Sequence, residues 1–367
     1  MKTRTKGPKI VISGYYGFDN CGDEAVLLSI IHCLRQLAPE ARITVLSGSP
    51  DKTRESYGVK AANRWNPVII AKELATCRLL ISGGGSLIQD VTSARSPGYY
   101  LGVIRMALFL RKKVMIYGQG VGPLTIEKNR AGTGSVFSRC HAIALRDAAS
   151  AELLRELGVR QNILVACDPV MALSCDDVDP GKWKEESGKQ KVEKPLLLAV
   201  IRCWKDNGHI APVAELLDTQ ISKGWDVLLV PAHFPADMEA IAMLRGAMKT
   251  QPQSIDKCLT AREFLSLIAS ADRVFSMRLH GLICAMALGV PMLGLSYDPK
   301  VGAFMEQAGA EEYCLSFDGF DLSAAIRMMG ELDSLLPERV KEREARQTEM
   351  RHLAWEMAKA AELLINY

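Results

Sequence analysis

The stretch KIVISGYYGFDNCGDEAVLLSIIHCLRQL, residues 9–37, contains the arrangement from which the whole chain is built. Its first residues form a short apolar run rich in β-branched side chains, which predicts a buried strand. The glycine-rich segment Gly14–Glu24 follows, and Glu24–Leu37 has the apolar spacing of a helix. A strand, a glycine-rich loop and a helix in this order are typical of a parallel sheet covered by helices.

Apolar runs of the same kind recur in two series, and helical patterns separate them. The first series starts at Lys9, Ala41, Arg78, Lys113, Ala142 and Ile163, and the second at Leu196, Asp226, Arg273, Pro291 and Tyr313. Each series predicts a doubly wound α/β domain, in which ligands bind beyond the carboxyl ends of the strands. We therefore expect two Rossmann-like domains that face a cleft holding the active site.

Changes in composition set the expected domain bounds. Residues 1–175 form the N-terminal domain, the polar stretch 176–194 a linker, 195–336 the C-terminal domain and 337–367 a C-terminal helix. Apolar residues recur in this helix at spacings of four, three and four, which predicts one buried stripe. The stripe consists of Leu353, Met357, Ala360 and Leu364.

Charge and cysteine usage exclude several classes of protein. Lysine and arginine number 45 and aspartate and glutamate 42, so the net charge of +3 argues against a nucleic-acid-binding protein. The ten cysteines form no C-x-x-C pair and most lie in apolar runs, as free thiols do in a reducing cytosol. No apolar run approaches the ~18 residues that cross a bilayer, and the N-terminus does not have the pattern of a signal peptide. We therefore expect a cytoplasmic protein.

Three glycine-rich loops follow strands of the first series: Gly14–Glu24, Gly83–Asp90 and Tyr117–Leu124. Glycine lets backbone N–H groups approach an anion closely, and a following helix N-terminus favours negative charge. Gly84 and Gly85 are therefore candidate ligand-binding residues. None of the loops is a G-x-G-x-x-G fingerprint or a P-loop, and tight turns between strand and helix remain an alternative.

The segment SMRLHG, Ser276–Gly281, ends a strand of the second series. Arg278 and His280 are two residues apart, so both side chains point to one side if the extended backbone persists to His280, with Gly281 opening a helix. An arginine beside a histidine holds an anionic substrate while the histidine exchanges a proton. The alternative is a structural histidine with Arg278 in an ion pair.

Other cations lie near predicted strand ends, namely Arg146, Arg202 and Lys300. Lys300 follows Asp298-Pro299, a signature of a helix N-cap and first turn. Arg146 precedes Asp147, so a local salt bridge is an alternative to a ligand contact. No H-E-x-x-H motif and no carboxylate cluster with the spacing of metal ligands is visible, and we expect neither a metal nor a cofactor.

The motifs together resemble the polysaccharide pyruvyl transferase family, and within it the bacterial enzymes of secondary cell wall polymer synthesis. The resemblance covers roughly residues 8–335. It rests on GYYGFDNCGDEA, ISGGGSLIQD, YGQGVGPL, ALRDAAS, CDPV, SMRLHG, GVP and SYDPK in this order.

This resemblance implies a glycosyltransferase-B-like pair of Rossmann domains and phosphoenolpyruvate as the donor. The product is a cyclic pyruvate ketal on two hydroxyls of a sugar, with release of phosphate. The C-terminal domain takes the phosphoenolpyruvate and the N-terminal domain the acceptor. The family's arginine–leucine–histidine segment falls on Arg278, Leu279 and His280, and its loop acid on Asp23.

The resemblance also implies a role for each matched residue. His280 is the general acid, Arg278 and Asp23 complete the catalytic set, and Asp23 orients or deprotonates an acceptor hydroxyl. The implied substrate-binding residues are Arg146, Lys300, Leu279, Gly281, Gly84, Gly85 and Arg202.

The best-matching group of the family implies a 4,6-ketal on β-N-acetylmannosamine of a lipid-linked wall precursor, at which surface-layer proteins dock. Such an acceptor suggests peripheral contact with the cytoplasmic membrane face, for which Arg111, Lys112 and Lys113 are candidates. An ordinary amphipathic helix is the alternative for this stretch. Two other functions stay open: a glycosyltransferase with a nucleotide-sugar donor, and a non-catalytic wall-polymer binding protein.

Overall fold

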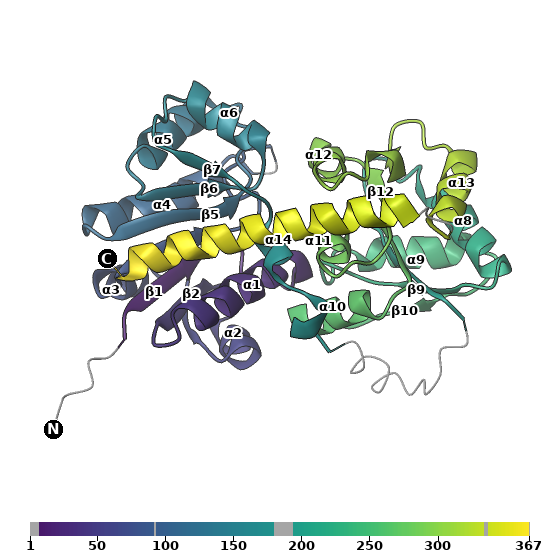
Figure 1. Cartoon of the computed structure of the whole chain (residues 1–367), viewed down its shortest axis with the longest axis horizontal. Coiled ribbons are helices and arrows are strands. Elements are labelled where there is room, and N and C mark those ends of the chain that lie inside the picture. The colour runs from purple at the N-terminus through teal and green to yellow at the C-terminus, as the bar shows by residue number, and fades with distance from the viewer. Residues whose placement is uncertain (1–6, 92, 180–193, 334–336, 367) are drawn as a thin grey trace. The chain divides into compact units, whose positions relative to one another are not determined.

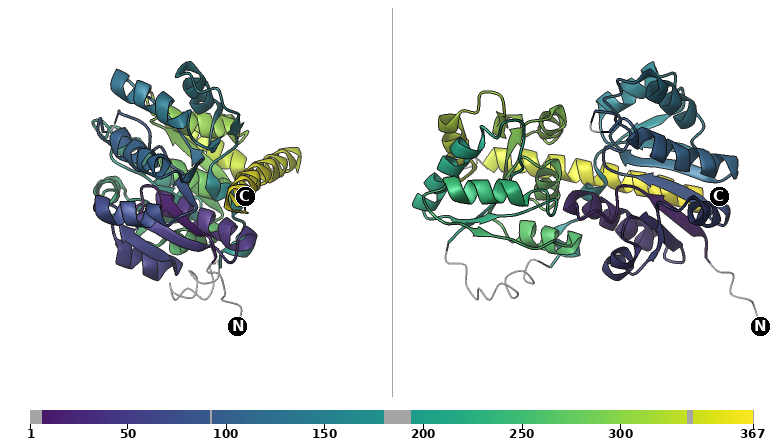
Figure 2. Two further views of the ribbon diagram at one scale, coloured as in Figure 1. Left: turned by 90° about the vertical axis from the view of Figure 1, so that its left-hand side faces the viewer. Right: turned by 180° about the vertical axis from the view of Figure 1, so that it is seen from behind.

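The computed structural model describes residues 7–91, 93–179, 194–333 and 337–366, and it divides the chain into two compact units (Figure 1). The first unit comprises Met1–Phe18, Asp23–Ala172 and Met350–Tyr367, and the second comprises Asp19–Gly22 and Leu173–Glu349. Each unit contains one parallel sheet with helices packed against it (Figure 2).

The sheet of the first unit has seven strands among the described residues, in the order β3-β2-β1-β4-β5-β6-β7. All neighbouring strands are parallel, and the interior strand β1 is buried along its whole length. The strands are β1 (Lys9–Ser13), β2 (Arg42–Ser47), β3 (Lys60–Asn63), β4 (Leu79–Gly83), β5 (Lys113–Gln119), β6 (Ala142–Leu145) and β7 (Ile163–Val165).

The helices of the first unit alternate with its strands. They are α1 (Cys21–Leu37), α2 (Pro50–Tyr57), α3 (Pro67–Ala75), α4 (Ser96–Phe109), α5 (Glu127–Phe137) and α6 (Ala148–Glu156), with the 3₁₀ turn η1 (Pro169–Ala172). The first two residues of α1 are grouped with the second unit. One core cluster joins Leu80 and Val114 of the sheet to Ile104 of α4 and Phe137 of α5. Alternation of buried strands and helices is the packing that the apolar runs predict.

The sheet of the second unit has six strands among the described residues, in the order β10-β9-β8-β11-β12-β13, and again every pair is parallel. The strands are β8 (Leu196–Val200), β9 (Asp226–Leu229), β10 (Gln253–Ser254), β11 (Arg273–Ser276), β12 (Met292–Ser296) and β13 (Cys314–Ser316). Both sheets therefore share the strand order of a doubly wound Rossmann-like fold.

The helices of the second unit are α8 (Ile210–Ser222), α9 (Met238–Ala247), α10 (Ala261–Ala269), α11 (Leu279–Ala287), α12 (Pro299–Gln307) and α13 (Leu322–Asp333), with turns η2 (Cys175–Asp177) and η3 (Glu311–Tyr313). The long helix α14 (Pro337–Asn366) contributes its residues up to Glu349 to the second unit and those from Met350 to the first.

The predicted fold class, two Rossmann-like α/β domains, is confirmed. The unit bounds differ from the predicted domains at three places. Asp19–Gly22 belongs to the second unit, the second unit begins at Leu173, and the C-terminal helix is divided between the units. Residues 180–193 of the predicted linker lie outside the described residues.

The buried stripe of α14 is not the predicted one. Only Met357 of the predicted set is buried, while Leu353, Ala360 and Leu364 are half-exposed. The buried residues are Met350, Ala354, Met357, Ala358, Ala361 and Ile365. Two apolar stripes overlap on this helix, and the small alanines allow the closer approach to the first unit's core.

Candidate active site

The switch point of the second sheet lies between β8 and β11, where the strand order reverses. Ligands of doubly wound sheets bind at this point, beyond the carboxyl ends of the strands. Arg202 follows β8, Arg278 and His280 follow β11, and Lys300 follows β12. Because β8, β11 and β12 are neighbours in the sheet, four of the predicted residues lie at one edge.

The backbone at Arg278 turns into a helix earlier than predicted. Strand β11 ends at Ser276, Arg278 is the extended N-cap of α11, and His280 lies in the first helical turn. The prediction that extended backbone persists to His280, with Gly281 opening the helix, is therefore wrong. The Arg278 carbonyl accepts hydrogen bonds from the Ser276 hydroxyl (2.7 Å) and from the Gly281 N–H (2.9 Å), which closes the turn at Arg278.

Gly281 has a packing role in this turn. A Cβ atom at Gly281 would lie 2.4 Å from Oγ of Ser276 and 3.6 Å from Cβ of Val200. Only glycine lets α11 approach β8 and β11 this closely. The Gly281 N–H is already bonded to the Arg278 carbonyl, so the structure gives this residue a structural function.

Asp237 fixes the guanidinium of Arg278. Nε of Arg278 donates to Oδ2 of Asp237 (3.1 Å) and Nη2 donates to Oδ1, while Nη1 takes no part in this pair. The Asp237 carboxylate is fully buried and also accepts from the backbone N–H groups of Ala232 (3.1 Å) and His233 (2.9 Å). The ion pair that was an alternative for Arg278 is thus present, and it engages Nε and Nη2 but not Nη1.

Gly22 packs against the imidazole of His280. A Cβ atom at Gly22 would lie 2.4 Å from Nδ1 of His280, so only a glycine fits beside the ring. The segment around Gly22 is held in the second unit, because the Cys21 N–H donates to the Ala232 carbonyl (2.7 Å) and the Phe234 N–H donates to the Asp19 carbonyl (3.0 Å). The sequence predicted an anion-binding glycine-rich loop here. The packing of Gly22 against His280 could not be predicted from it.

Arg202 packs against two aromatic rings that also contact each other, with ring centroids 4.8 Å apart. Its guanidinium carbon is 5.2 Å from the ring centroids of both Trp204 and Tyr297, and Nη1 donates to the Tyr297 hydroxyl (3.1 Å). Tyr297 follows β12, so this contact joins the loops after two neighbouring strands. Cation–π contacts of this kind hold a guanidinium in place without neutralising its charge.

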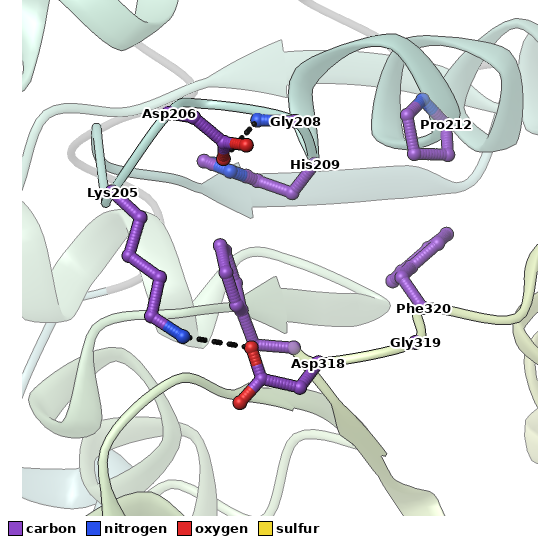
Figure 3. A pocket seen from close by; sticks show the side chains of 9 residues that line it. Lys205, Asp206, Gly208, His209, Pro212, Asp318, Gly319 and Phe320 are labelled. Carbon is purple, nitrogen blue, oxygen red and sulfur yellow. Dashed lines mark hydrogen bonds and ion pairs between the residues drawn. The ribbon is translucent and has the colours of Figure 1, made fainter.

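A cavity of 540 Å³ lies beside these loops (Figure 3). Its lining comes from the loop after β8, the start of α8 and the loop after β13: Lys205, Asp206, Gly208, His209, Pro212, Phe317, Asp318, Gly319 and Phe320. Lys205 forms an ion pair with Asp318 (2.8 Å). Within the part of the chain that the structure describes, Nδ1 of the buried His209 has no hydrogen-bond partner.

Burial lowers the pKa of His209, which favours the neutral ring at pH 7. Its Nε2 lies 3.0 Å from the Arg202 carbonyl, so Nε2 carries the proton and Nδ1 is an acceptor. Sequence reasoning passed over His209, because only the fold places it beside Arg202.

Arg146 of the first unit is buried among acids. Its guanidinium lies 3.6 Å from carboxylates of Asp147 and of the fully buried Asp168, and Nη2 donates to the Ser86 hydroxyl (3.2 Å). The local pair with Asp147, predicted as an alternative, is present, and Asp168 adds a second acid that the sequence did not indicate. Arg146 is only 6% exposed, in contrast to the 16% of Arg278.

Asp23 and the second glycine-rich loop meet at the carboxyl edge of the first sheet. Asp23 lies in the first turn of α1, and a Cβ atom at Gly85 would be 2.8 Å from its Oδ1. Gly84 and Gly85 have positive φ angles of 51° and 68°, and the Gly84 N–H donates to the Tyr117 carbonyl (2.8 Å). Gly84 is therefore part of a tight turn after β4, which was the alternative to a ligand-binding role.

Asp90 ends the same loop and ties it to the loop after β5. Its carboxylate accepts from N–H and Oγ1 of Thr125 (2.8 and 3.0 Å), from N–H of Ile126 (3.0 Å) and from the Asn129 amide (3.0 Å). Burial raises the pKa of Asp90, but these donors outweigh it and lower the pKa to about 2. The motif residue Asp90 is thus a structural anchor.

The described residues include neither a metal-binding cluster nor a membrane-spanning helix. In residues 7–91, 93–179, 194–333 and 337–366, no three or more His, Cys, Asp or Glu side chains are grouped so as to hold a metal ion. No described helix combines the length and the apolar character that a membrane span requires.

Solved structures define the fold class. A glycosyltransferase from Rickettsia africae aligns with a TM-score of 0.64 at 14% identity, covering 98% of both chains. The UDP-GlcNAc 2-epimerase of Neisseria meningitidis aligns with a TM-score of 0.63 at 12% identity, covering 98% of this chain and 100% of that one. These likenesses show a glycosyltransferase-B-like fold of two Rossmann-like domains.

The family follows from the sequence comparison. The model of the family described as polysaccharide pyruvyl transferase matches residues 20–299, and the chain belongs to this family. The amylovoran biosynthesis protein AmsJ of Erwinia amylovora is 22% identical over 406 residues, covering 94% of this chain and 96% of that protein. Family membership makes the protein a transferase with a saccharide acceptor.

Proposed function

We propose that the protein transfers the pyruvyl group of phosphoenolpyruvate onto two hydroxyls of one sugar and releases phosphate. The observation that carries the proposal is the pair of Arg278 and His280 at the switch point of the second sheet. Arg278 is held by the buried Asp237 through Nε and Nη2, and His280 lies two residues further on, in the first turn of α11.

The charges at this edge suit such a donor. Phosphoenolpyruvate carries a carboxylate and a phosphate, and Arg202, Arg278 and Lys300 follow three neighbouring strands. Arginine binds planar or tetrahedral oxyanions through paired N–H groups. The N-termini of α11 and α12 lie in the same loops, and their partial positive charge favours an anion.

The reaction needs one proton donor and a stabilised leaving group. Protonated His280 gives a proton to the methylene carbon, which becomes a methyl group and leaves an oxocarbenium-like centre at the neighbouring carbon. One sugar hydroxyl attacks this centre, and the bond to the phosphate oxygen then breaks with its electron pair. The second hydroxyl closes the ring. Of the two hydroxyl protons, one replaces the proton of His280 and the other leaves on phosphate, while the cations stabilise the departing charge.

Asp23 is our candidate for handling the acceptor. Its carboxylate lies in the first turn of α1 against Gly85, at the edge of the first sheet where ligands of this fold bind. A carboxylate there orients an acceptor hydroxyl or takes its proton. The buried Arg146 supports the same edge through Ser86, a residue of the loop that contains Gly85.

The acceptor that we propose is β-N-acetylmannosamine of a lipid-linked secondary cell wall polymer precursor, ketalised at its 4- and 6-hydroxyls. The support is the motif pattern of the sequence together with family membership. Contact of Arg111, Lys112 and Lys113 with the cytoplasmic membrane face, and anchoring of surface-layer proteins by the product, belong to the same proposal.

The test is phosphate release from phosphoenolpyruvate in the presence and absence of a soluble β-N-acetylmannosaminide. We expect release that depends on the acceptor and a product heavier by one pyruvate minus water. The matched control for His280→Ala is His352→Ala, since His352 is exposed on α14. Consumption of a nucleotide sugar instead would identify a glycosyltransferase, and saccharide binding without turnover of either donor would identify a binding protein.

A further inference from the structure

Four aromatic side chains form a continuous surface in the first unit, which we name the aromatic platform: Tyr15, Phe18, Trp65 and Tyr99. Tyr15 stacks on Phe18 with ring centroids 4.3 Å apart, Phe18 meets Trp65 edge-on at 6.1 Å, and Trp65 lies 5.8 Å from Tyr99. Tyr15 and Phe18 follow β1 and Trp65 follows β3. The platform therefore lies at the carboxyl edge of the sheet, the edge at which this fold binds ligands.

Arg64 holds the platform in one arrangement. It is 3% exposed, and its guanidinium carbon is 5.0 Å from the centroid of Phe18, 5.1 Å from Trp65 and 4.5 Å from Tyr99. Nη1 donates to the Gly14 carbonyl (2.6 Å), and the Tyr99 hydroxyl donates to the Arg64 carbonyl (3.0 Å). The rings are thus fixed before any ligand arrives, which reduces the entropy that binding costs.

The platform stays open to solvent despite these contacts. Trp65 is 62% exposed, and Tyr15, Phe18 and Tyr99 are half-exposed. Single exposed apolar residues need no explanation, but a rigid cluster of aromatic rings at the ligand edge of a sheet marks a binding surface. The faces of these rings carry a weak negative charge.

This combination suits a sugar ring. One face of a pyranose consists of C–H groups that carry a weak positive charge, and its rim consists of hydroxyls. Such a face stacks on an aromatic ring while the hydroxyls bond to polar groups around it. A nucleic acid is a poorer fit, because the cation of the cluster is buried and leaves no phosphate contact.

The platform also lies beside the proposed acceptor residue. Tyr15 lies two residues after β1, and Asp23 lies in the first turn of α1, the helix that follows the same loop at the carboxyl edge of the sheet. Burial and then the Asp23 carboxylate raise the pKa of the Tyr15 phenol, which agrees with this placement. We propose that the aromatic platform binds the saccharide acceptor by stacking a sugar ring on Trp65, next to the sugar whose hydroxyls Asp23 orients. The choice of occupant rests on the proposed function, since family membership supplies a saccharide acceptor.

Calorimetry without phosphoenolpyruvate tests the platform independently of turnover. The probes are a soluble tetrasaccharide ending in β-linked N-acetylmannosamine and the methyl glycoside of that sugar alone. We expect Trp65→Ala to weaken tetrasaccharide binding about fivefold, in the range of one aromatic stacking contact, and to leave the methyl glycoside unchanged. Trp65→Phe retains most of the affinity. Phe109→Ala, which removes another exposed ring of the same unit, retains all of it.

Each result decides between the two proposals. Equal tetrasaccharide affinity of wild type and Trp65→Ala, or no binding to wild type, overturns the platform. Trp65-dependent binding without phosphate release keeps the platform as a saccharide site and overturns the proposed reaction. In the active enzyme, Trp65→Ala raises the KM for the tetrasaccharide and leaves kcat and the KM for phosphoenolpyruvate unchanged. Normal turnover of Trp65→Ala with an unchanged KM for the tetrasaccharide would overturn the proposal that the platform binds the acceptor and would leave the proposed reaction standing.

Discussion

The two sheets have the same strand order around β1 and β8, yet their carboxyl edges carry different side chains. At the second sheet, Arg278 reaches the surface and its fully buried partner Asp237 is bonded to two backbone N–H groups as well. At the first sheet, Arg146 is itself buried, and its partner Asp168 accepts from the Val170 N–H. One topology thus supplies both edges, but the arginine of the second edge is partly exposed, whereas the arginine of the first edge is buried and supports the loops from within.

The largest effect that this comparison predicts is loss of turnover in His280→Ala. Removing a general acid costs about 10²–10⁴ in rate. The fold stays intact, because His280 is half-exposed in the first turn of α11. Phosphate release measures the rate, and a urea unfolding curve checks the fold. More than a third of wild-type turnover in His280→Ala would remove this residue from the acid role.

The second prediction sets the two arginines against each other. Arg146→Met leaves a buried acid short of its partner, and we expect it to lower the free energy of unfolding by about 3 kcal/mol. Arg278→Met is expected to cost less stability, since two backbone N–H groups still bond Asp237. For the KM of phosphoenolpyruvate we expect the opposite order, with a larger increase in Arg278→Met than in Arg146→Met. Equal stability losses of both variants in urea titrations would contradict the inferred difference between the buried Arg146 and the partly exposed Arg278.

The third prediction concerns Asp237 as a positioning residue for Arg278. Asp237→Asn keeps the shape but removes the charge that holds the guanidinium, and we expect about a tenfold rise in the KM for phosphoenolpyruvate. The KM for the acceptor is expected to stay within twofold of wild type, a split that a general loss of structure does not produce. A parallel rise of both KM values would assign Asp237 to the stability of the unit alone.

The smallest effect concerns Asp90, which lies in the loop after β4, the strand of the first sheet that corresponds to β11 of the second. Its pKa is about 2 in the fold against an ordinary value of 3.8, so its stabilisation is complete above about pH 4 and is lost as the pH falls toward 2. Asp90→Asn is expected to lower the free energy of unfolding by about 1–2 kcal/mol at pH 6. Urea titrations at pH 6, 4 and 3 should show the difference from wild type shrinking with pH. A constant difference would contradict the role of the charge.

Much of the fold could be predicted because buried parallel strands are continuous apolar runs. The edge strand β3, with the sequence KAAN, and the two-residue β10 have no such run and were missed. The stripe of α14 was misplaced, because local spacing does not say which of two apolar stripes meets the core.

The site was predictable only where its residues are neighbours in sequence. Arg278 and His280 share one short motif, and Asp298 caps α12 before Lys300 as its pattern indicated. Asp237 lies 41 residues from Arg278, and Gly22 is far from His280 in the chain, so no local pattern reveals either contact. The aromatic platform likewise joins three segments that only the sheet brings together.

The division of α14 has a consequence for synthesis on the ribosome. Residues from Met350 complete the first unit: the Cys167 thiol donates to the Met350 carbonyl, Lys113 bonds to the Leu364 carbonyl, and Arg78 to that of Asn366. These residues are translated after the entire second unit. The unit that begins first therefore completes its core last. The apolar surface against which Met350, Ala354, Met357 and Ala361 pack stays uncovered while about 180 residues are added at 5–20 per second.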